Sequence, residues 1–306
     1  MSSAIRTENL VKEFRIRTVT ALDGVNMDVP EGAIYALVGP NGAGKTTAIK
    51  VLMNIFRATS GHAEVLGTDS SRLRGEAFTT IGYVSENQEM PGWMDLRRLL
   101  AFLRPFYPTW DLSLERDLVR ELDLPLDRKL SKFSRGMRMK AAMLSSLAYH
   151  PKLIVLDEPF GGLDPLVRDQ LIEGLVERAA EATIFVSSHD LAEIENLASH
   201  VGYLEEGHLR FSEEQAELLE RFREVELALD APPSLDRPWP ASWMQVASTE
   251  HVLRFIESRF DAERTSAEIR NLFGEVRDVT FRPMSLRAIF VAMARAGRPS
   301  AGGSTV

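Results

Sequence analysis

The chain has 306 residues, of which 44% are hydrophobic and 26% are charged. This length corresponds to about two domains, and the composition excludes a disordered, collagen-like or low-complexity protein. The net charge of −8 argues against a protein that coats nucleic acid, and the lack of cysteine excludes disulfides and cysteine nucleophiles.

Short apolar runs rich in β-branched residues indicate buried strands at residues 33–38, 153–156 and 183–186. Continuous apolar runs of this length are typical of parallel strands that are covered on both faces. A helical pattern follows the first and the third run, which predicts an α/β fold with a parallel sheet. Each run is far shorter than the roughly 20 residues that span a bilayer, so we expect a soluble chain.

Amphipathic patterns predict helices over residues 96–106, 112–122 and 136–149, with prolines between them. We therefore expect a helical subdomain at about 90–150, inserted into a domain of residues 1–212. A smaller α+β domain is expected over 213–295. Its expected elements are a strand at 224–229, a helix at 262–273, a strand at 276–282 and a helix at 285–295. Residues 296–306 are predicted to be a disordered tail.

A glycine-rich segment, Gly-Pro-Asn-Gly-Ala-Gly-Lys-Thr, directly follows the first predicted strand and precedes a helix. In a phosphate-binding loop, glycines let backbone N–H groups face an anion, and the next helix adds its positive end. Lys45 can reach the β- and γ-phosphates, and the Thr46 hydroxyl can bind Mg²⁺. An incidental glycine-rich turn is the alternative. The residues expected to contact the nucleotide here are Gly39, Pro40, Asn41, Gly42, Ala43, Gly44, Lys45, Thr46 and Thr47.

Two acidic residues, Asp157 and Glu158, follow the second predicted strand. Ligands of open α/β sheets bind at the carboxyl ends of the strands. We predict that Asp157 holds Mg²⁺ and that Glu158 polarises the attacking water, because a phosphoryl-transfer site needs both functions. Two acids at a strand end could instead form only a solvated turn, but the phosphate loop favours the catalytic interpretation.

With these two motifs in place, residues 1–212 resemble the ATP-binding cassette (ABC) family of ATPases. The segment at 130–138 resembles the family's signature motif, in which Ser134 and the Gly136 N–H would face the γ-phosphate held by a second subunit. Phe133, Arg135 and Met137 depart from the common wording of this motif. They resemble a form found in exporter ATPases with separate permeases, and a weakened motif in one half of a heterodimer is the alternative.

The resemblance implies roles for further residues. Phe14 stands where the family has an aromatic side chain that stacks on adenine, and Asp164 ends a segment similar to the D-loop. His189 resembles the switch histidine that contacts the γ-phosphate. Gln88 is the candidate for the residue that senses Mg²⁺ and water, with Glu86 as the alternative because it occupies the usual position.

The resemblance also implies a P-loop NTPase core with a parallel sheet, an antiparallel β-subdomain and a helical insertion. It implies ATP and Mg²⁺ as cofactors, a second ABC ATPase subunit in a homodimer or heterodimer, and an integral membrane permease. We expect an ATP-hydrolysing transporter subunit, held at the cytoplasmic face of the membrane through that permease. Residues 279–290 resemble the end of type-2 exporter ATPases, which favours export. A soluble single-cassette regulator is the alternative, and a P-loop kinase or GTPase would need no signature motif.

Overall fold

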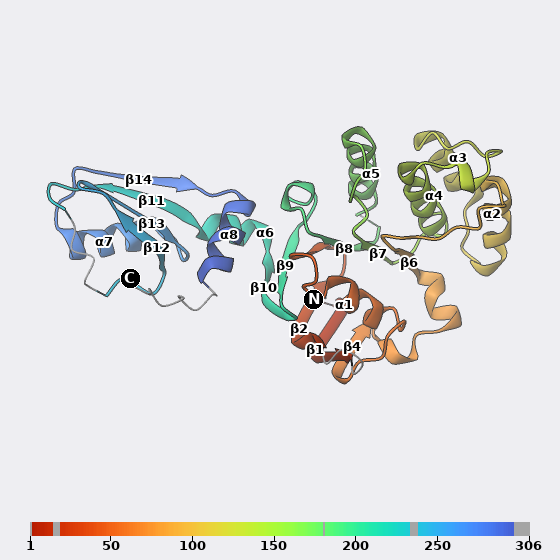
Figure 1. Ribbon diagram of the computed structural model, residues 1–306, viewed down its shortest axis with the longest axis horizontal. Coiled ribbons are helices and arrows are strands. Elements are labelled where there is room, and N and C mark those ends of the chain that lie inside the picture. The colour runs from red at the N-terminus through yellow and green to blue at the C-terminus, as the bar shows by residue number, and fades with distance from the viewer. Residues whose placement is uncertain (1, 15–18, 180, 233–237, 297–306) are drawn as a thin grey trace, which may run out of the picture. The chain divides into compact units, whose positions relative to one another are not determined.

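The computed structural model describes residues 2–14, 19–179, 181–232 and 238–296. The chain divides into two compact units, Met1–Ser212 and Glu213–Val306 (Figure 1). The tail predicted to be disordered lies outside the described residues, except for Ala296. In the described part of the chain, no helix has the length and apolarity needed to cross a bilayer.

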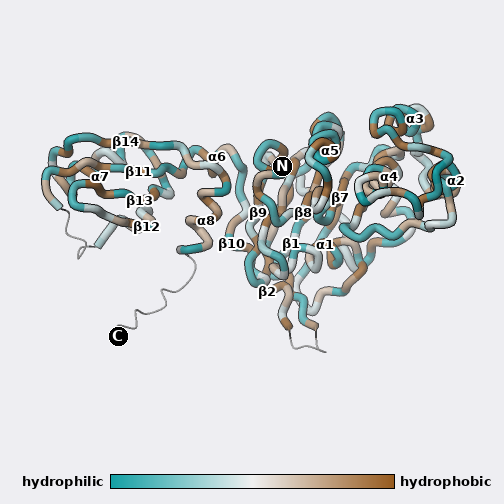
Figure 2. Tube along the Cα trace, turned by 45° about the horizontal axis from the view of Figure 1, so that its top comes forward, coloured by the Kyte–Doolittle hydropathy of each residue, from teal (hydrophilic) through white to brown (hydrophobic). Residues whose placement is uncertain are grey.

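The centre of the first unit is a six-stranded sheet in the order β10-β9-β3-β8-β7-β6. Strands β3 (Ile34–Val38), β8 (Thr183–Ser188) and β7 (Leu153–Asp157) pair in parallel, and every residue in them is buried. The parallel pairing extends to β6 (Ile81–Val84) and β9 (His200–Glu205), and β10 (His208–Glu214) lies at the edge. The predicted buried parallel strands are therefore present, and Figure 2 shows hydrophobic colour near the labels β7 and β8.

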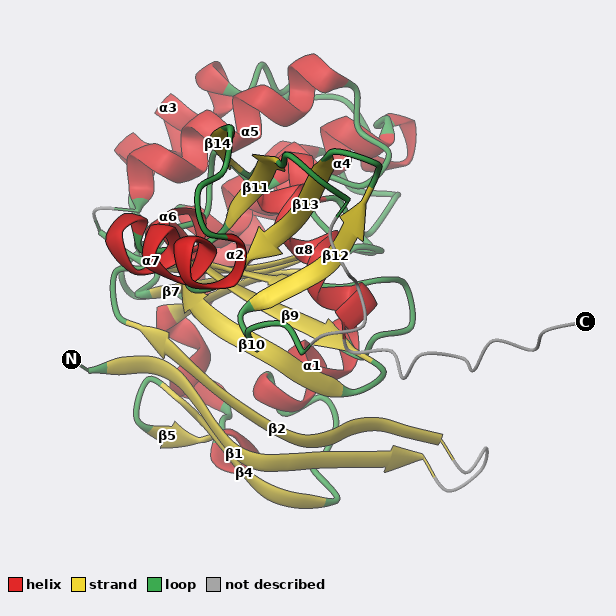
Figure 3. Ribbon diagram, turned by 90° about the vertical axis from the view of Figure 1, so that its left-hand side faces the viewer, coloured by secondary structure: helices red, strands yellow, loops and turns green. Residues whose placement is uncertain are grey.

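Helices cover both faces of this sheet. Helix α1 (Lys45–Leu52) lies on one side, and α4 (Arg135–Leu147) and α5 (Pro165–Arg178) lie on the other (Figures 1 and 3). This arrangement buries the continuous apolar strands on both faces, as a parallel sheet requires.

A second, antiparallel sheet has the order β2-β1-β4-β5. Figure 3 shows its two long strands, β1 (Ser3–Phe14) and β2 (Val19–Pro30), side by side. The shorter strands are β4 (Ser60–Val65) and β5 (Thr68–Asp69). Apolar side chains of this sheet share one core with α1 and the central sheet, which fixes the position of the loop before α1.

The expected helical subdomain contains α2 (Leu96–Leu103), α3 (Leu112–Glu121) and α4. Asp95 caps α2 by accepting a hydrogen bond from Arg98 N–H, and Asp111 caps α3 in the same way. The 3₁₀ turns η3 (Arg104–Phe106) and η4 (Leu130–Lys132) belong to this subdomain, whereas η1 (Ser70–Arg72) and η2 (Gly75–Thr80) lie between β5 and β6.

The prediction of an α-helix after the third apolar run is wrong. The structure has only the turn η5 (Leu191–Glu193) there, closed by the Asp190 carboxylate on Ala192 N–H. The connection ends at His200, where β9 begins, and it forms turns rather than a helix like the one that follows β7. The longer helix α5 instead follows β7, where the sequence pattern had not indicated one.

The second unit is a four-stranded antiparallel sheet in the order β12-β13-β11-β14, with α7 (Ala262–Phe273) over one face (Figure 3). The strands are β11 (Arg223–Ala228), β12 (Trp243–Ser248), β13 (Val252–Glu257) and β14 (Asp278–Pro283). The other helices are α6 (Gln215–Arg221) and α8 (Leu286–Ala296).

The sequence pattern missed β12 and β13. In β12, the register of the pairing with β13 shifts between Met244 and Ala247, and Gln245 has a φ of 53°, so the alternation of apolar and polar residues in β12 is broken. Packing holds the two strands together, because the rings of Trp243 and Phe255 stack at 3.7 Å in a core of their own.

Candidate active site

The loop between β3 and α1 has the geometry of a phosphate cradle. Gly44 has a φ of 110°, and a Cβ there would lie 2.4 Å from Ala21 O, so only glycine fits. The next residue, Lys45, is 5% exposed and folds back over the loop. Its Nζ donates hydrogen bonds to Gly39 O at 2.7 Å and Pro40 O at 3.2 Å. Carbonyl groups of the loop thus hold the Lys45 cation beside the place where a phosphate would bind.

Asp157 joins the loop to the end of β7. This carboxylate is 2% exposed, and its Oδ1 accepts hydrogen bonds from Thr46 Oγ1 at 3.0 Å and Ser187 Oγ at 2.7 Å. Carboxylate and hydroxyl oxygens are ligands that Mg²⁺ prefers, so Thr46 and Asp157 fit this ion. Among the described residues, no group of three acidic or histidine side chains could hold a metal alone. Such a site suits Mg²⁺ that takes its remaining ligands from phosphate oxygens and water.

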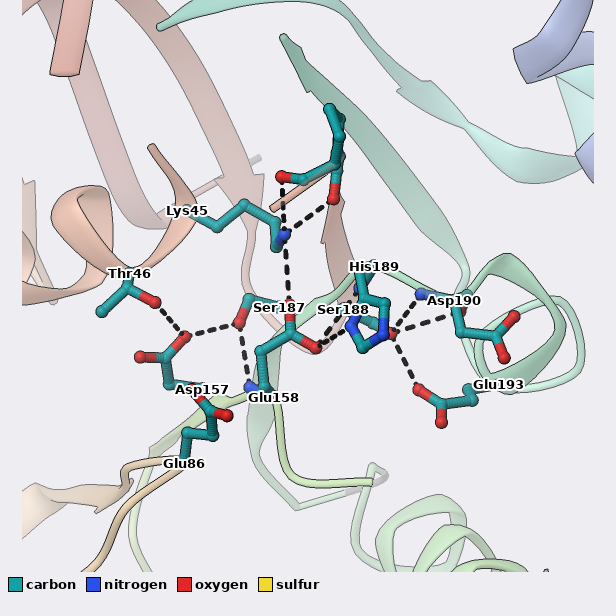
Figure 4. Close-up of polar contacts among 12 residues, drawn as sticks. Lys45, Thr46, Glu86, Asp157, Glu158, Ser187, Ser188, His189, Asp190 and Glu193 are labelled. Atoms are coloured by element: carbon teal, nitrogen blue, oxygen red, sulfur yellow. Dashed lines mark hydrogen bonds and ion pairs between the residues drawn. The ribbon is translucent and has the colours of Figure 1, made fainter. Parts of the chain in front are cut away.

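Glu158 lies at the centre of the polar network in Figure 4. Its Oε1 is 3.1 Å from Lys45 Nζ, and its Oε2 is 2.7 Å from His189 Nδ1. The ring donates this second bond, because a carboxylate only accepts. Glu158 has a φ of 50°, a conformation that non-glycine residues seldom adopt outside turns and functional sites. Its own N–H donates to Ser187 Oγ at 3.0 Å, which stabilises this turn.

A further group of residues lies behind His189 and was missed by the sequence analysis. Ser188 Oγ donates to Glu193 Oε2 at 2.8 Å and accepts from Asp190 N–H at 3.0 Å. Burial raises the pKa of Glu193, while the hydrogen bond from Ser188 acts in the opposite direction. Hydrogen bonds among Ser188, Asp190 and Glu193 thus stabilise the segment that carries His189. Serine is too common after a strand to signal this arrangement.

A pocket of about 430 Å³ opens over the phosphate loop. Its other walls come from β2, the turn before β10, and two acidic residues, Glu86 and Glu158. Gln88 is not among the lining residues, because its Oε1 turns back to accept from Ser85 N–H at 3.2 Å and Ser85 Oγ at 3.1 Å. Of the two residues considered for sensing Mg²⁺, Glu86 is therefore the one at the pocket.

Phe14 also lies apart from the lining of this pocket. Its ring packs edge-on against Phe56, with centroids 5.5 Å apart, and Lys12 Nζ lies 5.0 Å from its centroid. The wall on the β2 side is formed instead by Val19, Thr20 and Ala21.

Three predicted site residues lie at helix N-termini rather than at the pocket. Ser134 caps α4 by accepting from Met137 N–H at 3.2 Å, and Asp164 caps α5 by accepting from Leu166 N–H at 3.0 Å. Gly136 lies in the first turn of α4, against Val167. The structure does not bring them to Lys45 of the same chain.

Comparison with known proteins matches the family model described as "ABC transporter" to residues 22–161. The bacitracin transport ATP-binding protein BcrA of Enterococcus faecalis is 34% identical over 215 residues, which is 68% of each chain. The lantibiotic transport ATP-binding protein SrtF of Streptococcus pyogenes is also 34% identical, over 69% of this chain and 90% of its own length.

Solved structures of ATP-binding cassettes have the same fold as residues of the first unit. The ATP-binding subunit of an ABC transporter covers 71% of this chain and 92% of its own, with 26% identity and a TM-score of 0.65. A dimeric post-hydrolysis ATP-binding cassette bound to ADP and Pi has the same fold over 69% of this chain, at 21% identity and a TM-score of 0.61. Together with the P-loop core, these similarities show that the chain belongs to the ATPases of the ABC transporter family.

Proposed function

We propose that this chain hydrolyses ATP to drive export through a separate membrane permease, at the cytoplasmic face of the membrane. The observation that carries the proposal is the contact of Lys45 and His189 with the two oxygens of Glu158, directly over the phosphate loop. The proposed direction, export, follows the form of the signature segment at 130–138 and the ending at 279–290. The relatives are named as bacitracin and lantibiotic transport proteins, which fits a transporter role.

In the proposed reaction, backbone N–H groups of the loop and Lys45 bind the β- and γ-phosphates of ATP. Lys45 would then exchange Glu158 for phosphate oxygens, which leaves Glu158 free to orient and polarise the attacking water. His189 donates to Glu158 in the structure, and we propose that it contacts the γ-phosphate once ATP is bound. Thr46 and Asp157 would hold Mg²⁺, and Glu86, which lines the pocket, would sense the ion in place of Gln88. The ion supplies positive charge that offsets the charge developing on the phosphoryl oxygens.

The signature residues are proposed to act on a second subunit. Ser134 and Gly136 begin α4 away from the pocket of their own chain, so a second ABC ATPase is needed to bring such a helix end to the γ-phosphate. Closure of the two cassettes on two ATP molecules, and their release after hydrolysis, would form the two-state element that moves the permease.

Residues 1–212 are proposed to be the nucleotide-binding domain and 213–295 an accessory domain for packing or dimerisation. Each unit has its own apolar core. ATP with Mg²⁺ should therefore raise the melting temperature of one calorimetric transition and leave a second unchanged. A single transition that shifts as a whole would contradict this division.

The test of the transporter role is purification of the tagged chain from detergent-solubilised membranes of its own cell. Recovery of a stoichiometric polytopic membrane protein, and ATP hydrolysis by that complex, would support the proposal. A second cassette in the complex would identify a heterodimer. Recovery of the chain with no membrane partner would overturn the exporter role and favour a soluble ABC regulator.

A further inference from the structure

Arg135 occupies a position between two segments that border the active site. It is the first residue of α4, directly after the N-cap Ser134. Its Nη2 lies 3.9 Å from Oε1 of Glu86, and both side chains are about half exposed. Glu86 itself lines the pocket over the phosphate loop. The start of the signature helix is thus tied by charge to an acidic side chain at the nucleotide pocket of the same subunit.

The same guanidinium packs on the turn that follows Glu158. A Cβ built on Gly162 would lie 3.1 Å from Arg135 Nη1, and one on Gly161 would lie 3.7 Å from Nη2. Gly161 N–H donates to the carbonyl of Glu158, so this turn begins at the proposed catalytic residue. It ends at Asp164, the N-cap of α5. Arg135 therefore contacts both a pocket residue and the backbone that leads to the D-loop aspartate.

We infer that Arg135 is a positioning residue, which couples the start of α4 to the Mg²⁺–ATP pocket of its own subunit through Glu86. The inference rests on the proposed function, because it requires Mg²⁺–ATP at the phosphate loop. Glu86 has two competing cationic partners: the guanidinium of Arg135 and the metal ion that accompanies ATP. A displacement of α4 that carries Arg135 away releases Glu86 towards the nucleotide. Binding of Mg²⁺–ATP releases Arg135 in return, because coupling between two sites is reciprocal.

The test is a double-mutant cycle on ATP binding, with the full chain and the Glu158→Gln background to prevent turnover. Calorimetric titrations with ATP at a series of Mg²⁺ concentrations give the Mg²⁺ concentration for half-maximal binding. Arg135→Gln is expected to lower this concentration by about threefold, as is typical for the loss of an exposed ion pair. Glu86→Gln is expected to raise it, and Arg135→Gln should have no further effect in the Glu86→Gln background.

Two outcomes of the cycle overturn the inference. One is an Arg135→Gln chain with the Mg²⁺ dependence of its parent. The other is an equal shift with and without Glu86, which would mean that Arg135 acts only on a partner's nucleotide. Failure of the parent chain to bind ATP at any Mg²⁺ concentration would overturn the proposed function itself, so the two failures are distinguishable.

A glycine pair tests the second contact of Arg135. Gly162 and Gly24 both have a φ of 67°, but a Cβ on Gly24 would meet no atom within 4 Å. Gly162→Ala and Gly24→Ala therefore both place a Cβ at the same positive φ, and only the first brings it against Arg135, whose guanidinium must shift by a few tenths of an ångström. Both should lower the melting temperature, whereas only Gly162→Ala should shift the Mg²⁺ dependence, in the same direction as Arg135→Gln and by less. Identical Mg²⁺ dependence of the two alanine variants would contradict a role of the Gly162 contact in holding Arg135 near Glu86.

Discussion

Lys45 and Glu158 form a buried ion pair, with 3.1 Å between Nζ and Oε1. The lysine belongs to the phosphate loop and the glutamate to the turn after β7, so the pair closes the pocket across two segments that are far apart in the sequence. Because Lys45 also serves the phosphates in the proposed reaction, binding of ATP and release of Glu158 are one exchange. The carboxylate that we propose as catalytic is therefore paired with the Lys45 cation until the phosphates of a nucleotide take over that cation.

Glu158→Gln is expected to lower the turnover of ATP by about 10³-fold while ATP still binds. The amide keeps the size of the side chain but cannot act on water as a base, and general-base catalysis contributes about 10² to 10⁴ in rate. Lys45 also loses a competing anion, so the dissociation constant for ATP should stay equal or fall. Steady-state hydrolysis and calorimetric binding measure the two effects.

The matched control is Glu173→Gln, which changes an exposed glutamate on α5. Its turnover and affinity should equal those of the parent. Near-normal hydrolysis by the Glu158→Gln chain would remove Glu158 from the catalytic role.

Lys45→Ala is expected to weaken ATP binding more than about tenfold, because each lost hydrogen bond to a charged phosphate costs about 1.5–3 kcal/mol. The variant should also melt at a lower temperature, since Glu158 keeps His189 as its partner but loses the cation at Oε1. Lys50→Ala on the same helix is the control, because Lys50 lies over the ring of Phe56 and does not line the pocket. Equal ATP affinity in the two variants would contradict the phosphate-loop assignment.

Glu86→Ala and Gln88→Ala separate the two candidates for the residue that senses Mg²⁺. Glu86 lines the pocket, whereas Gln88 bonds back to Ser85. We expect Glu86→Ala to lower Mg²⁺-dependent hydrolysis by about tenfold, as is typical for loss of one contact to a charged group. Gln88→Ala should change it less than about twofold. The reverse order of effects would restore Gln88 to the role.

The sequence predicted the parts of the site whose residues are contiguous. Gly39 to Thr46, Asp157 and Glu158 form local motifs next to strongly apolar strands, and the structure brings them together at the carboxyl ends of those strands. Ser187 could not be predicted in this way. It acts through space, by donating to Asp157 and accepting from Glu158 N–H, and a serine at a strand end carries no signal of that contact.

The prediction of the fold from the sequence failed at some elements for physical reasons of the same kind. Periodicity located α7 at its observed bounds, because apolar residues such as Ile269 recur on one face. It missed β12, where the bulge at Gln245 interrupts the alternation. It also predicted a helix after β8, where Asp190 caps a turn and no α-helix forms before β9. Local patterns thus failed where tertiary pairing decided the conformation.

Glu193→Gln is expected to flatten the dependence of stability on pH. Burial raises the pKa of Glu193 above its ordinary range, so the folded chain binds this proton more tightly than the unfolded chain does. The contribution of Glu193 to stability is therefore most favourable below the unfolded pKa. It is lost as the pH rises through the raised folded pKa. A glutamine removes the titration and still accepts the hydrogen bond from Ser188.

Thermal melts of the parent and the variant at a series of pH values from about 4.5 to 8 measure this effect. The melting temperature of the Glu193→Gln chain should rise relative to that of the parent as the pH rises through this window. Above it, the difference between the two temperatures should stay constant. Glu173→Gln, at an exposed position, should run parallel to the parent at every pH. A Glu193→Gln curve that also runs parallel to the parent would mean that Glu193 ionises equally easily in the folded and the unfolded chain.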